Sequence, residues 1–225
     1  MKENLMPNIL ITGANRGIGL EFARHYTSEG WDVIATARDP GEAGDLSATG
    51  ARVLALDLAD PASVDAFVAE IGDTPIDVLL SNAGVMGPLA PDRDGWIETL
   101  AVNAVAPTLL ALRLKPNLKA GTLKKAIATT SRMGSIADND SGGFYAYRSS
   151  KAALNAAWKS LAIEFKADGI AVAVVHPGWV QTDMGGPNAM IDTKTSIAGL
   201  AKIVDDLDLA TTGRFWDYSG DEIAW

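Results

Sequence analysis

The stretch Thr12-Gly13-Ala14-Asn15-Arg16-Gly17-Ile18-Gly19 decides the fold that we expect for this chain. It follows a short apolar segment, Asn8–Thr12, and precedes a helical pattern that runs from Gly17 to Glu29. Its glycines allow the backbone to turn tightly and to approach a pyrophosphate, while the first amides of the helix point at the phosphates. A strand, a glycine-rich turn and a helix in this order predict a dinucleotide-binding unit. The residues expected to contact the dinucleotide here are Gly13, Asn15, Arg16, Gly17, Ile18 and Gly19.

Short apolar runs alternate with amphipathic segments along the whole chain. The predicted strands are Asn8–Thr12, Trp31–Thr36, Arg52–Leu56, Asp77–Leu80, Lys125–Thr130, Ile170–His176 and Arg214–Trp216. The predicted helices are Gly17–Glu29, Pro61–Ile71, Asp94–Leu114, Tyr145–Ala167 and Thr193–Asp206, the third with a kink at Pro107. This alternation implies a parallel sheet with helices on both faces, folded as one domain over residues 1–225. Ligands of such sheets bind outside the carboxyl ends of the strands.

Composition excludes several classes of protein. The chain has 225 residues and no cysteine, so disulfides, thiol nucleophiles and thiolate metal sites are excluded. A net charge of −9 disfavours nucleic acid and anionic membranes as partners. No apolar run approaches the ~20 residues that cross a bilayer, and the N-terminal residues do not resemble a signal peptide. We therefore expect a cytoplasmic protein without nucleic-acid or membrane partners.

The choice of dinucleotide is expected at the end of the second strand. An acidic residue there binds the ribose hydroxyls of NAD, whereas a basic one neutralises the 2′-phosphate of NADP. Arg38 stands at this position and Arg16 lies in the glycine turn, so two guanidinium groups can converge on one phosphate. We predict NADP(H) over NAD(H). The alternative is that Arg38 is a solvated residue paired with Asp39.

The third strand is followed by Asp57 and Leu58. Asp57 is placed to meet the amino group of adenine. The alternative, which the sequence favours almost as much, is a carboxylate in a turn or at the start of the next helix.

The strongest chemical signal is Tyr147-Arg148-Ser149-Ser150-Lys151. Residues i and i+4 share a helix face, so the phenol of Tyr147 and the ammonium of Lys151 are neighbours. A cation beside a phenol favours the phenolate and lowers its pKa towards the pH at which a proton-transfer catalyst works. This pair predicts an acid/base centre.

Other polar residues follow neighbouring strands in the predicted sheet. Ser131 ends the fifth strand, where the carbonyl of a substrate would lie, and Asn103 lies within the long third helix. The loop after the sixth strand includes Thr182, which suits a nicotinamide carboxamide. The further residues expected to contact the cofactor are Asn82, Ala83, Gly84, Pro177, Gly178, Val180 and Thr182, together with Tyr147 and Lys151.

Together these motifs resemble the single-domain branch of the short-chain dehydrogenase/reductase family, over essentially the whole chain from Ile9 to Trp225. Met133-Gly134-Ser135-Ile136 and Tyr145-Ala146-Tyr147-Arg148 look like the C-factor-like and sniffer-like carbonyl reductases of that family. The resemblance implies a Rossmann-type, seven-stranded sheet of order 3-2-1-4-5-6-7.

The resemblance also implies a division of chemical roles in an oxidoreductase that transfers hydride between NADP(H) and a carbonyl or alcohol. Tyr147 would be the acid/base, Lys151 would bind the nicotinamide ribose and tune Tyr147, and Ser131 would orient the carbonyl. Asn103 would hold a water in the proton relay. No metal is expected in this chemistry.

The chain departs from the family pattern between Ser131 and Tyr147, where Asp138–Gly143 looks like a small insertion. Ser135 is therefore a rival for the role of the serine, although alignment on the strand end favours Ser131. The residues that we expect to line an apolar substrate pocket are Met86, Met133, Tyr145, Trp179 and Met184, although such residues are more often plain core.

Two other functions are compatible with these motifs. The chain can be a dinucleotide-binding sensor or signalling protein, as the likeness to C-factor suggests. It can also be a nucleotide-sugar epimerase or dehydratase, for which its length leaves no substrate domain. Small residues on Tyr145–Ala167, such as Ala152 and Ala156, are a hint of a homodimer or homotetramer. The sequence names neither the substrate nor the direction of the reaction.

Overall fold

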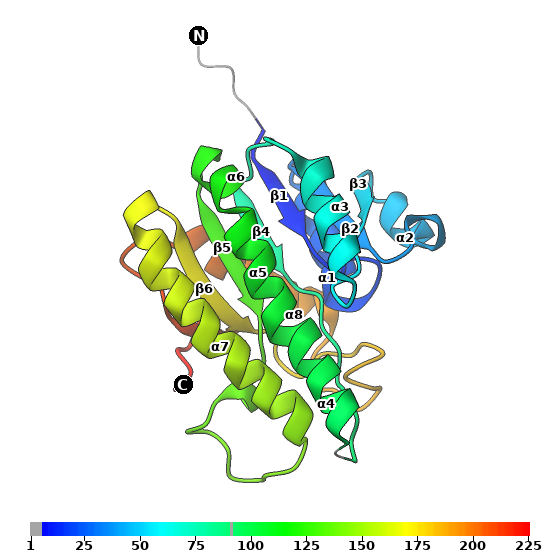
Figure 1. The fold of residues 1–225 in the computed structure, drawn as a ribbon, viewed down its shortest axis with the longest axis vertical. Coiled ribbons are helices and arrows are strands. Elements are labelled where there is room, and N and C mark those ends of the chain that lie inside the picture. The colour runs from blue at the N-terminus through cyan, green and yellow to red at the C-terminus, as the bar shows by residue number, and fades with distance from the viewer. Residues whose placement is uncertain (1–5, 91) are drawn as a thin grey trace.

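Seven parallel strands form one sheet in the order β3-β2-β1-β4-β5-β6-β7 (Figure 1). The structure is a computed structural model that describes residues 6–90 and 92–225. Its strands are β1 (Asn8–Ile11), β2 (Asp32–Ala37), β3 (Arg52–Ala55), β4 (Val78–Ser81), β5 (Lys125–Thr129), β6 (Ala171–His176) and β7 (Phe215–Asp217). The predicted Rossmann-type fold and strand order are thus confirmed.

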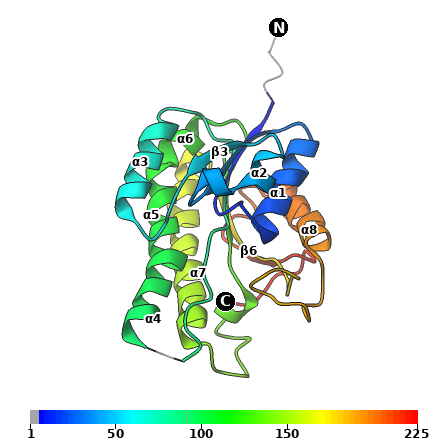
Figure 2. The same cartoon turned by 90° about the vertical axis from the view of Figure 1, so that its right-hand side faces the viewer.

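Helices cover both faces of this sheet, which makes three layers. The α-helices are α1 (Gly17–Ser28), α2 (Gly44–Ser47), α3 (Pro61–Ile71), α4 (Arg93–Leu100), α5 (Ala106–Arg113), α6 (Lys115–Ala120), α7 (Tyr145–Phe165) and α8 (Thr193–Asp206). Short turns of other helix types are η1 (Pro40–Glu42), η2 (Ala101–Val105), η3 (Arg132–Gly134) and η4 (Lys166–Asp168). Figure 2 shows α3 to α7 on one side of the sheet and α1, α2 and α8 on the other.

The strands are apolar on successive residues because both of their faces are buried. In β1, Leu10 joins the core beneath α3, α5 and α7, whereas Ile9 and Ile11 join the core beneath α1 and α8. All three side chains are fully buried. Each such side chain contributes roughly 1.5–3 kcal/mol through burial, so the two cores hold the sheet between its helix layers.

The third predicted helix is continuous but not uniform. Between α4 and α5 lies η2, a π-helical segment, and Pro107 stands in the first turn of α5. Proline has no amide hydrogen, so the carbonyl of Asn103, four residues earlier, lacks its ordinary α-helical donor. The sequence predicted a kink at Pro107, which stays a prediction; the π-helical turn before it was not predicted and is a feature often found at functional sites.

The helical stretch Arg93–Arg113 is also unusually apolar for its exposure. By length and composition it is able to cross a membrane, with mean hydropathy 1.3 in a window of which 39% is buried. In the structure α4 packs against α7, and α5 packs against α3, as core helices of an α/β sheet do. Ile97, Val105 and Leu109 are exposed on it. The predicted homodimer or homotetramer stays a prediction.

Because every strand is parallel, the loops that follow the strands all lie at one edge of the sheet. This carboxyl edge lies at the lower end of the sheet in Figure 1. Most of the candidate residues named above follow strands or lie in the first turns of helices at this edge, and Asn103 lies within the long helix on η2. The fold therefore gathers segments that are far apart in the sequence.

Candidate active site

The glycine turn between β1 and α1 is shaped by its main chain. Gly13 has φ of 64°, in the left-handed region that favours glycine. A Cβ on Gly19 would overlap the carbonyl oxygen of Gly13 and lie 2.7 Å from the side-chain nitrogen of Asn82. Only glycine fits at position 19 without movement of this turn.

Thr12 joins the glycine turn to the segment after β4. Its hydroxyl accepts hydrogen bonds from the amides of Asn82 (3.0 Å) and Ala83 (3.1 Å). The side chain of Asn82 in return donates to the carbonyls of Thr12 and Gly13. Asn82, Ala83 and Gly13 are thus brought together as expected, whereas the part of Thr12 was not predicted. A threonine directly before the first glycine of the turn was the available signal.

The basic residues near the end of β2 lie differently. Arg38 follows β2 directly and is exposed, and Asp39 accepts the amide of Gly41 at 2.9 Å within η1. Arg16 pairs with Asp183, on the loop after β6, at 3.4 Å, and both side chains are largely exposed. Such an exposed pair holds Arg16 weakly. Convergence of Arg16 and Arg38 on one phosphate stays a prediction.

Asp57 occupies a turn after β3. One carboxylate oxygen accepts the amide of Ala59, and the amide of Asp57 donates to the hydroxyl of Ser63, both at 2.9 Å. The turn interpretation of Asp57 therefore describes what the side chain does here. Leu58 is buried in the core. Contact of either residue with adenine stays a prediction.

Ser131, Tyr147 and Lys151 come together at the carboxyl end of β5. Ser131 caps η3, and its hydroxyl hydrogen-bonds to the side chain of Tyr147. The ammonium of Lys151 lies 5.8 Å from the centroid of the Tyr147 ring and donates to the carbonyl of Thr129 at 3.0 Å. All three side chains are buried. Thr129, the last residue of β5, thereby fixes Lys151 relative to the strand that leads to Ser131.

Burial governs the acid/base properties of this trio. It raises the pKa of Tyr147 above its ordinary value, and the hydrogen bond from Ser131 lowers it only in part. Burial also lowers the pKa of Lys151 to about 8. The expectation that Lys151 brings the pKa of Tyr147 down is thus not met in the protein alone, because loss of water around the phenol outweighs the other influences. A ligand that fills the crevice would change both environments.

Ser135, the rival serine, is bound elsewhere. Its hydroxyl donates to the carbonyl of Ala224 at 2.6 Å and accepts the amide of Asp138 at 3.0 Å. It therefore ties the turn after β5 to the C-terminal residues, and Ser131 is the serine that meets Tyr147. The choice made from the strand end agrees with this geometry.

Asn103 lies on η2 and links the long helix to the site. Its side chain donates to Ser150 on α7 at 3.0 Å and exchanges two hydrogen bonds, each of 2.8 Å, with the backbone of Val85. A Cβ on Gly84 would come within 3.1 Å of Asn103 and 3.4 Å of the Lys151 nitrogen. The side chain is occupied in this way, and the water that the resemblance implies at Asn103 stays a prediction.

The loop after β6 returns to the glycine turn. The carbonyl of Pro177 accepts the Ser196 hydroxyl of α8 at 2.6 Å, and Gly178 has a φ of 85°. A Cβ on Gly17 would lie 3.2 Å from the Thr182 methyl, so the glycine turn and the loop expected at the nicotinamide carboxamide lie side by side. Val180 is buried and pairs with Ile191.

The residues expected to line the substrate pocket are not all on one surface. Tyr145 is two residues from Tyr147, so it lies on another side of α7, where its ring contacts Trp96 of α4. Met133 lines a separate cavity of about 180 Å³ together with Arg148 and Ser149. We therefore do not place Tyr145 or Met133 beside the Tyr147 hydroxyl. Sequence reasoning missed Trp96, whose indole also donates to Ser149 at 2.8 Å.

Met86, Trp179 and Met184 follow β4 and β6 at the carboxyl edge. Trp179 and Met184 are about half exposed, at 51% and 48%. The indole of Trp179 donates to the carbonyl of Gly185 at 2.8 Å, which fixes one side of this loop. Their contact with a substrate stays a prediction.

A Rossmann-type sheet with a glycine turn and a Ser–Tyr–Lys trio at its carboxyl edge defines a class of dinucleotide-binding proteins, and comparison with known proteins agrees. The profile of the short chain dehydrogenase family matches residues 7–190. The chain is 42% identical over 164 residues to the C-signal protein of Myxococcus xanthus, covering 71% of this chain and 99% of that protein. It therefore belongs to the short chain dehydrogenase family.

Solved structures show the same likeness. The NADPH-bound carbonyl reductase from chicken fatty liver matches with a TM-score of 0.91 and 31% identity, over 98% of this chain and 99% of that one. The carbonyl reductase Sniffer of D. melanogaster matches with a TM-score of 0.88 and 33% identity, over 98% and 100% of the two chains. The predicted resemblance to C-factor-like and sniffer-like proteins is confirmed.

Proposed function

We propose that the protein is an NADP(H)-dependent carbonyl reductase that interconverts small carbonyl compounds and alcohols. The observation that carries the proposal is the buried contact of Tyr147 with the Ser131 hydroxyl and the Lys151 ammonium at the carboxyl edge of the sheet. A phenol, a hydroxyl and a cation around one point suit protonation of a polarised oxygen.

The residues at the edge fit a dinucleotide. The main chain at Gly13 and Gly19 leaves no room for side chains, which is the surface that a pyrophosphate requires, and the N-terminus of α1 begins at Gly17. Thr182 and Gly84 extend this surface towards Lys151. The residues that would hold the cofactor are the predicted set, with Thr12 shaping the turn between them.

The preference for NADP(H) rests on Arg38. It is exposed directly after β2, and no carboxylate pairs with it among the residues that the structure describes. Its guanidinium is therefore available for a 2′-phosphate. The solved relatives with bound NADPH or NADP support the same choice.

The reaction follows from the placement of the side chains. The bound nicotinamide cofactor supplies the hydride for reduction of the carbonyl carbon. Ser131 donates a hydrogen bond that orients the carbonyl oxygen, and Tyr147 transfers its phenolic proton to that oxygen as negative charge develops there. The Lys151 ammonium stabilises the resulting phenolate. A water on the Asn103 backbone carbonyl would return the proton through Lys151, and the reverse sequence oxidises an alcohol.

Replacement of the phenol tests the proposal. We expect Tyr147→Phe to lower kcat in an NADPH-oxidation screen of aldehydes, ketones and quinones by roughly 10²- to 10⁴-fold. The affinity for NADPH, measured by fluorescence titration, should remain nearly unchanged because the pyrophosphate surface is untouched.

Tyr26→Phe is the matched control for this substitution. The Tyr26 hydroxyl is buried without a hydrogen-bond partner among the described residues, and it lies on α1. Its removal should leave turnover intact. Equal turnover of Tyr147→Phe and Tyr26→Phe would rule out the proposed mechanism.

The similarity to C-signal supports a second candidate, a signalling protein that binds the dinucleotide with little turnover. The same screen separates the two functions. A sensor would bind NADPH tightly and oxidise it with none of the carbonyls, and Tyr147→Phe would then change nothing that the screen measures.

A further inference from the structure

The turn that carries Ser131 is too short to hold itself in place. Ser131 is an extended residue (φ −150°, ψ 147°) before η3, which has three residues. Its hydroxyl also accepts the amide of Met133 at 3.2 Å, so the direction of the hydroxyl depends on the turn. A single 3₁₀ turn has poor hydrogen-bond geometry of its own. Contacts with other segments must therefore fix Ser131 against Tyr147.

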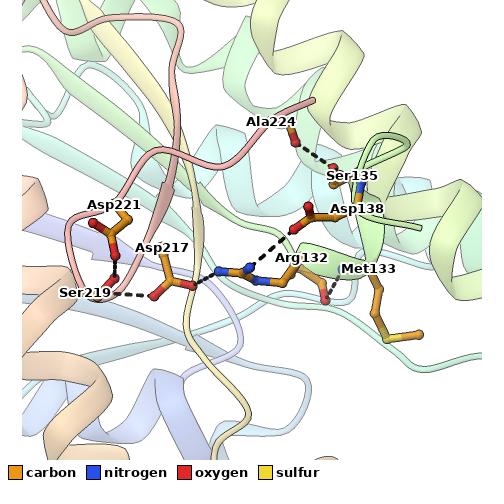
Figure 3. Close-up of polar contacts among 9 residues, drawn as sticks. Arg132, Met133, Ser135, Asp138, Asp217, Ser219, Asp221 and Ala224 are labelled. Carbon is orange, nitrogen blue, oxygen red and sulfur yellow. Dashed lines mark hydrogen bonds and ion pairs between the residues drawn. The ribbon is translucent and has the colours of Figure 1, made fainter. Parts of the chain in front are cut away.

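Arg132, the next residue, makes charged contacts with two other segments. One nitrogen of its guanidinium lies 2.9 Å from Asp217 at the end of β7, and another lies 3.2 Å from Asp138. Figure 3 shows the guanidinium between these two carboxylates, with Ser219 joining Asp217 to Asp221 beyond them. Arg132 thus links the serine turn to the C-terminal strand and to the segment that precedes Tyr147.

The two carboxylates differ in burial. The side chain of Asp217 is 8% exposed and that of Asp138 is 40% exposed, whereas the Arg132 side chain that they share is 53% exposed. A carboxylate that is shielded from water depends more on its cation than a carboxylate whose charge water screens. The pair between Arg132 and Asp217 is therefore the one that fixes the turn.

The charge states of the neighbours are consistent with this pair. Burial favours a higher pKa for Asp217, but hydrogen bonds from the Ser219 amide and the Arg132 guanidinium bring its pKa below the ordinary value. His176 faces Asp217 from β6, and burial lowers the pKa of this histidine to about 4. His176 is therefore neutral near pH 7, and the cation that balances Asp217 is Arg132.

We propose that Arg132 is a positioning residue whose ion pair with Asp217 holds the Ser131 hydroxyl against Tyr147. The inference rests on the proposed function and adds to it a tie between β7 and the acid/base centre. Two further bonds run along the same connection, from Ser135 to the carbonyl of Ala224 and from the amide of Ala137 to the carbonyl of Trp225 (Figure 3 shows the first). Arg132 itself does not touch the reacting atoms in this assignment.

Two isosteric substitutions test the proposal, each at one of the two carboxylates that contact the Arg132 guanidinium. Asp217→Asn should lower kcat for carbonyl reduction by roughly 10- to 100-fold, as a misplaced orienting group does. Asp138→Asn should change kcat by less than about twofold, because its partner charge stays in water. The affinity for NADPH should be unchanged in both. Equal kcat for the two variants would overturn the assignment.

A merely structural effect of Asp217→Asn is separated by a double-mutant cycle. In a Ser131→Ala background the hydroxyl that the pair positions is absent, so Asp217→Asn should lower kcat by less than about twofold. Urea unfolding of all variants records the loss of stability independently. If Asp217→Asn lowers kcat by the same factor with and without Ser131, the pair supports the fold but does not position the serine.

A measurement that needs no turnover keeps this inference distinct from the proposed function. In protein labelled with 3-fluorotyrosine, the ¹⁹F resonance of residue 147 is identified by its loss in Tyr147→Phe. Asp217→Asn and Ser131→Ala should both move this resonance, and Asp138→Asn should not. An unmoved resonance in Asp217→Asn overturns the inference, whereas absence of turnover in the wild-type protein with a moved resonance overturns only the proposed function.

Discussion

The two halves of the carboxyl edge are built differently. Around β1 and β4 the surface is main chain, shaped by Gly13, Gly19 and the Thr12 hydroxyl. Around β5 and β7 it consists of side chains, in which Arg132 and Asp217 join segments that are 85 residues apart. The first half presents backbone amides, which suit a phosphate group. The second half presents the side chains of Ser131, Tyr147 and Lys151. We call these the main-chain half and the side-chain half. We infer that an added Cβ in the main-chain half displaces its backbone, whereas the chemistry of the side-chain half responds to the loss of a single charge.

The largest effect is expected in the main-chain half. A Cβ at Gly19 would overlap the Gly13 carbonyl and lie 2.9 Å from the Ala14 Cα, so Gly19→Ala must displace the turn. We expect loss of NADPH binding and a decrease in the free energy of unfolding of about 3 kcal/mol, at the upper end for overpacking. Fluorescence titration and urea unfolding measure the two quantities.

Gly44→Ala is the control, since a Cβ there meets open space in α2. Its free energy of unfolding should change by less than about 1 kcal/mol. A Gly19→Ala variant that binds NADPH as Gly44→Ala does would remove the distinction between the two halves.

The second effect concerns Lys151 in the side-chain half. Its pKa falls from the ordinary value of 10.5 in the unfolded chain to about 8 in the folded protein because burial disfavours the ammonium. Below pH 8 the ammonium is charged in both states, so the folded state bears the full cost of the buried charge, roughly 3 kcal/mol. We expect Lys151→Met to be inactive but more stable than the wild type at pH 7, as shown by urea unfolding.

The direction in which the stability difference between Lys151→Met and the wild type changes with pH is a separate check. As the pH rises from 8 to 10.5, the folded protein loses the proton that the unfolded chain retains, and the cost disappears. The advantage of Lys151→Met should therefore shrink over this range. An advantage that stays constant up to pH 10.5 would mean that the charge on Lys151 is not what destabilises the fold.

The smallest effect is expected at the outer end of the main-chain half. Arg38→Ala removes an exposed guanidinium after β2 and should weaken NADPH binding by about 10- to 100-fold with little change for NADH. Arg52→Ala, at the amino end of β3, removes an equal charge far from this edge and should change neither affinity. Equal losses for NADPH and NADH would show that Arg38 does not select the phosphate.

The fold could be predicted because its signals are local. Strands such as Ala171–His176 are apolar on successive residues, and glycines in the sequence indicate the turn at Gly13. The contact between Tyr147 and Lys151 was also accessible, because residues four apart share one helix face. The short helix α2 and the π-helical η2 were missed, since each depends on packing around it and not on a repeated pattern.

The site was less accessible to sequence reasoning where its contacts join distant segments. Nothing in the sequence indicates that Arg132 pairs with Asp217 or that Trp96 contacts Tyr145. The pKa of Tyr147 could not be predicted from the sequence either. The neighbouring ammonium could be seen in the sequence, but the degree of burial that raises the pKa of the phenol could not.

The tie between Asp217 and Arg132 also sets an order of assembly during synthesis. Chains emerge N-terminal residues first, and domains begin to fold as they emerge. The strands and loops that form the glycine turn are complete once β4 has been made, but the serine turn waits for residues 215–225 before its bonds to Asp217, Ala224 and Trp225 can form. A chain that folds as it is made can thus form its glycine turn well before the turn at Ser131 is tied to residues 215–225.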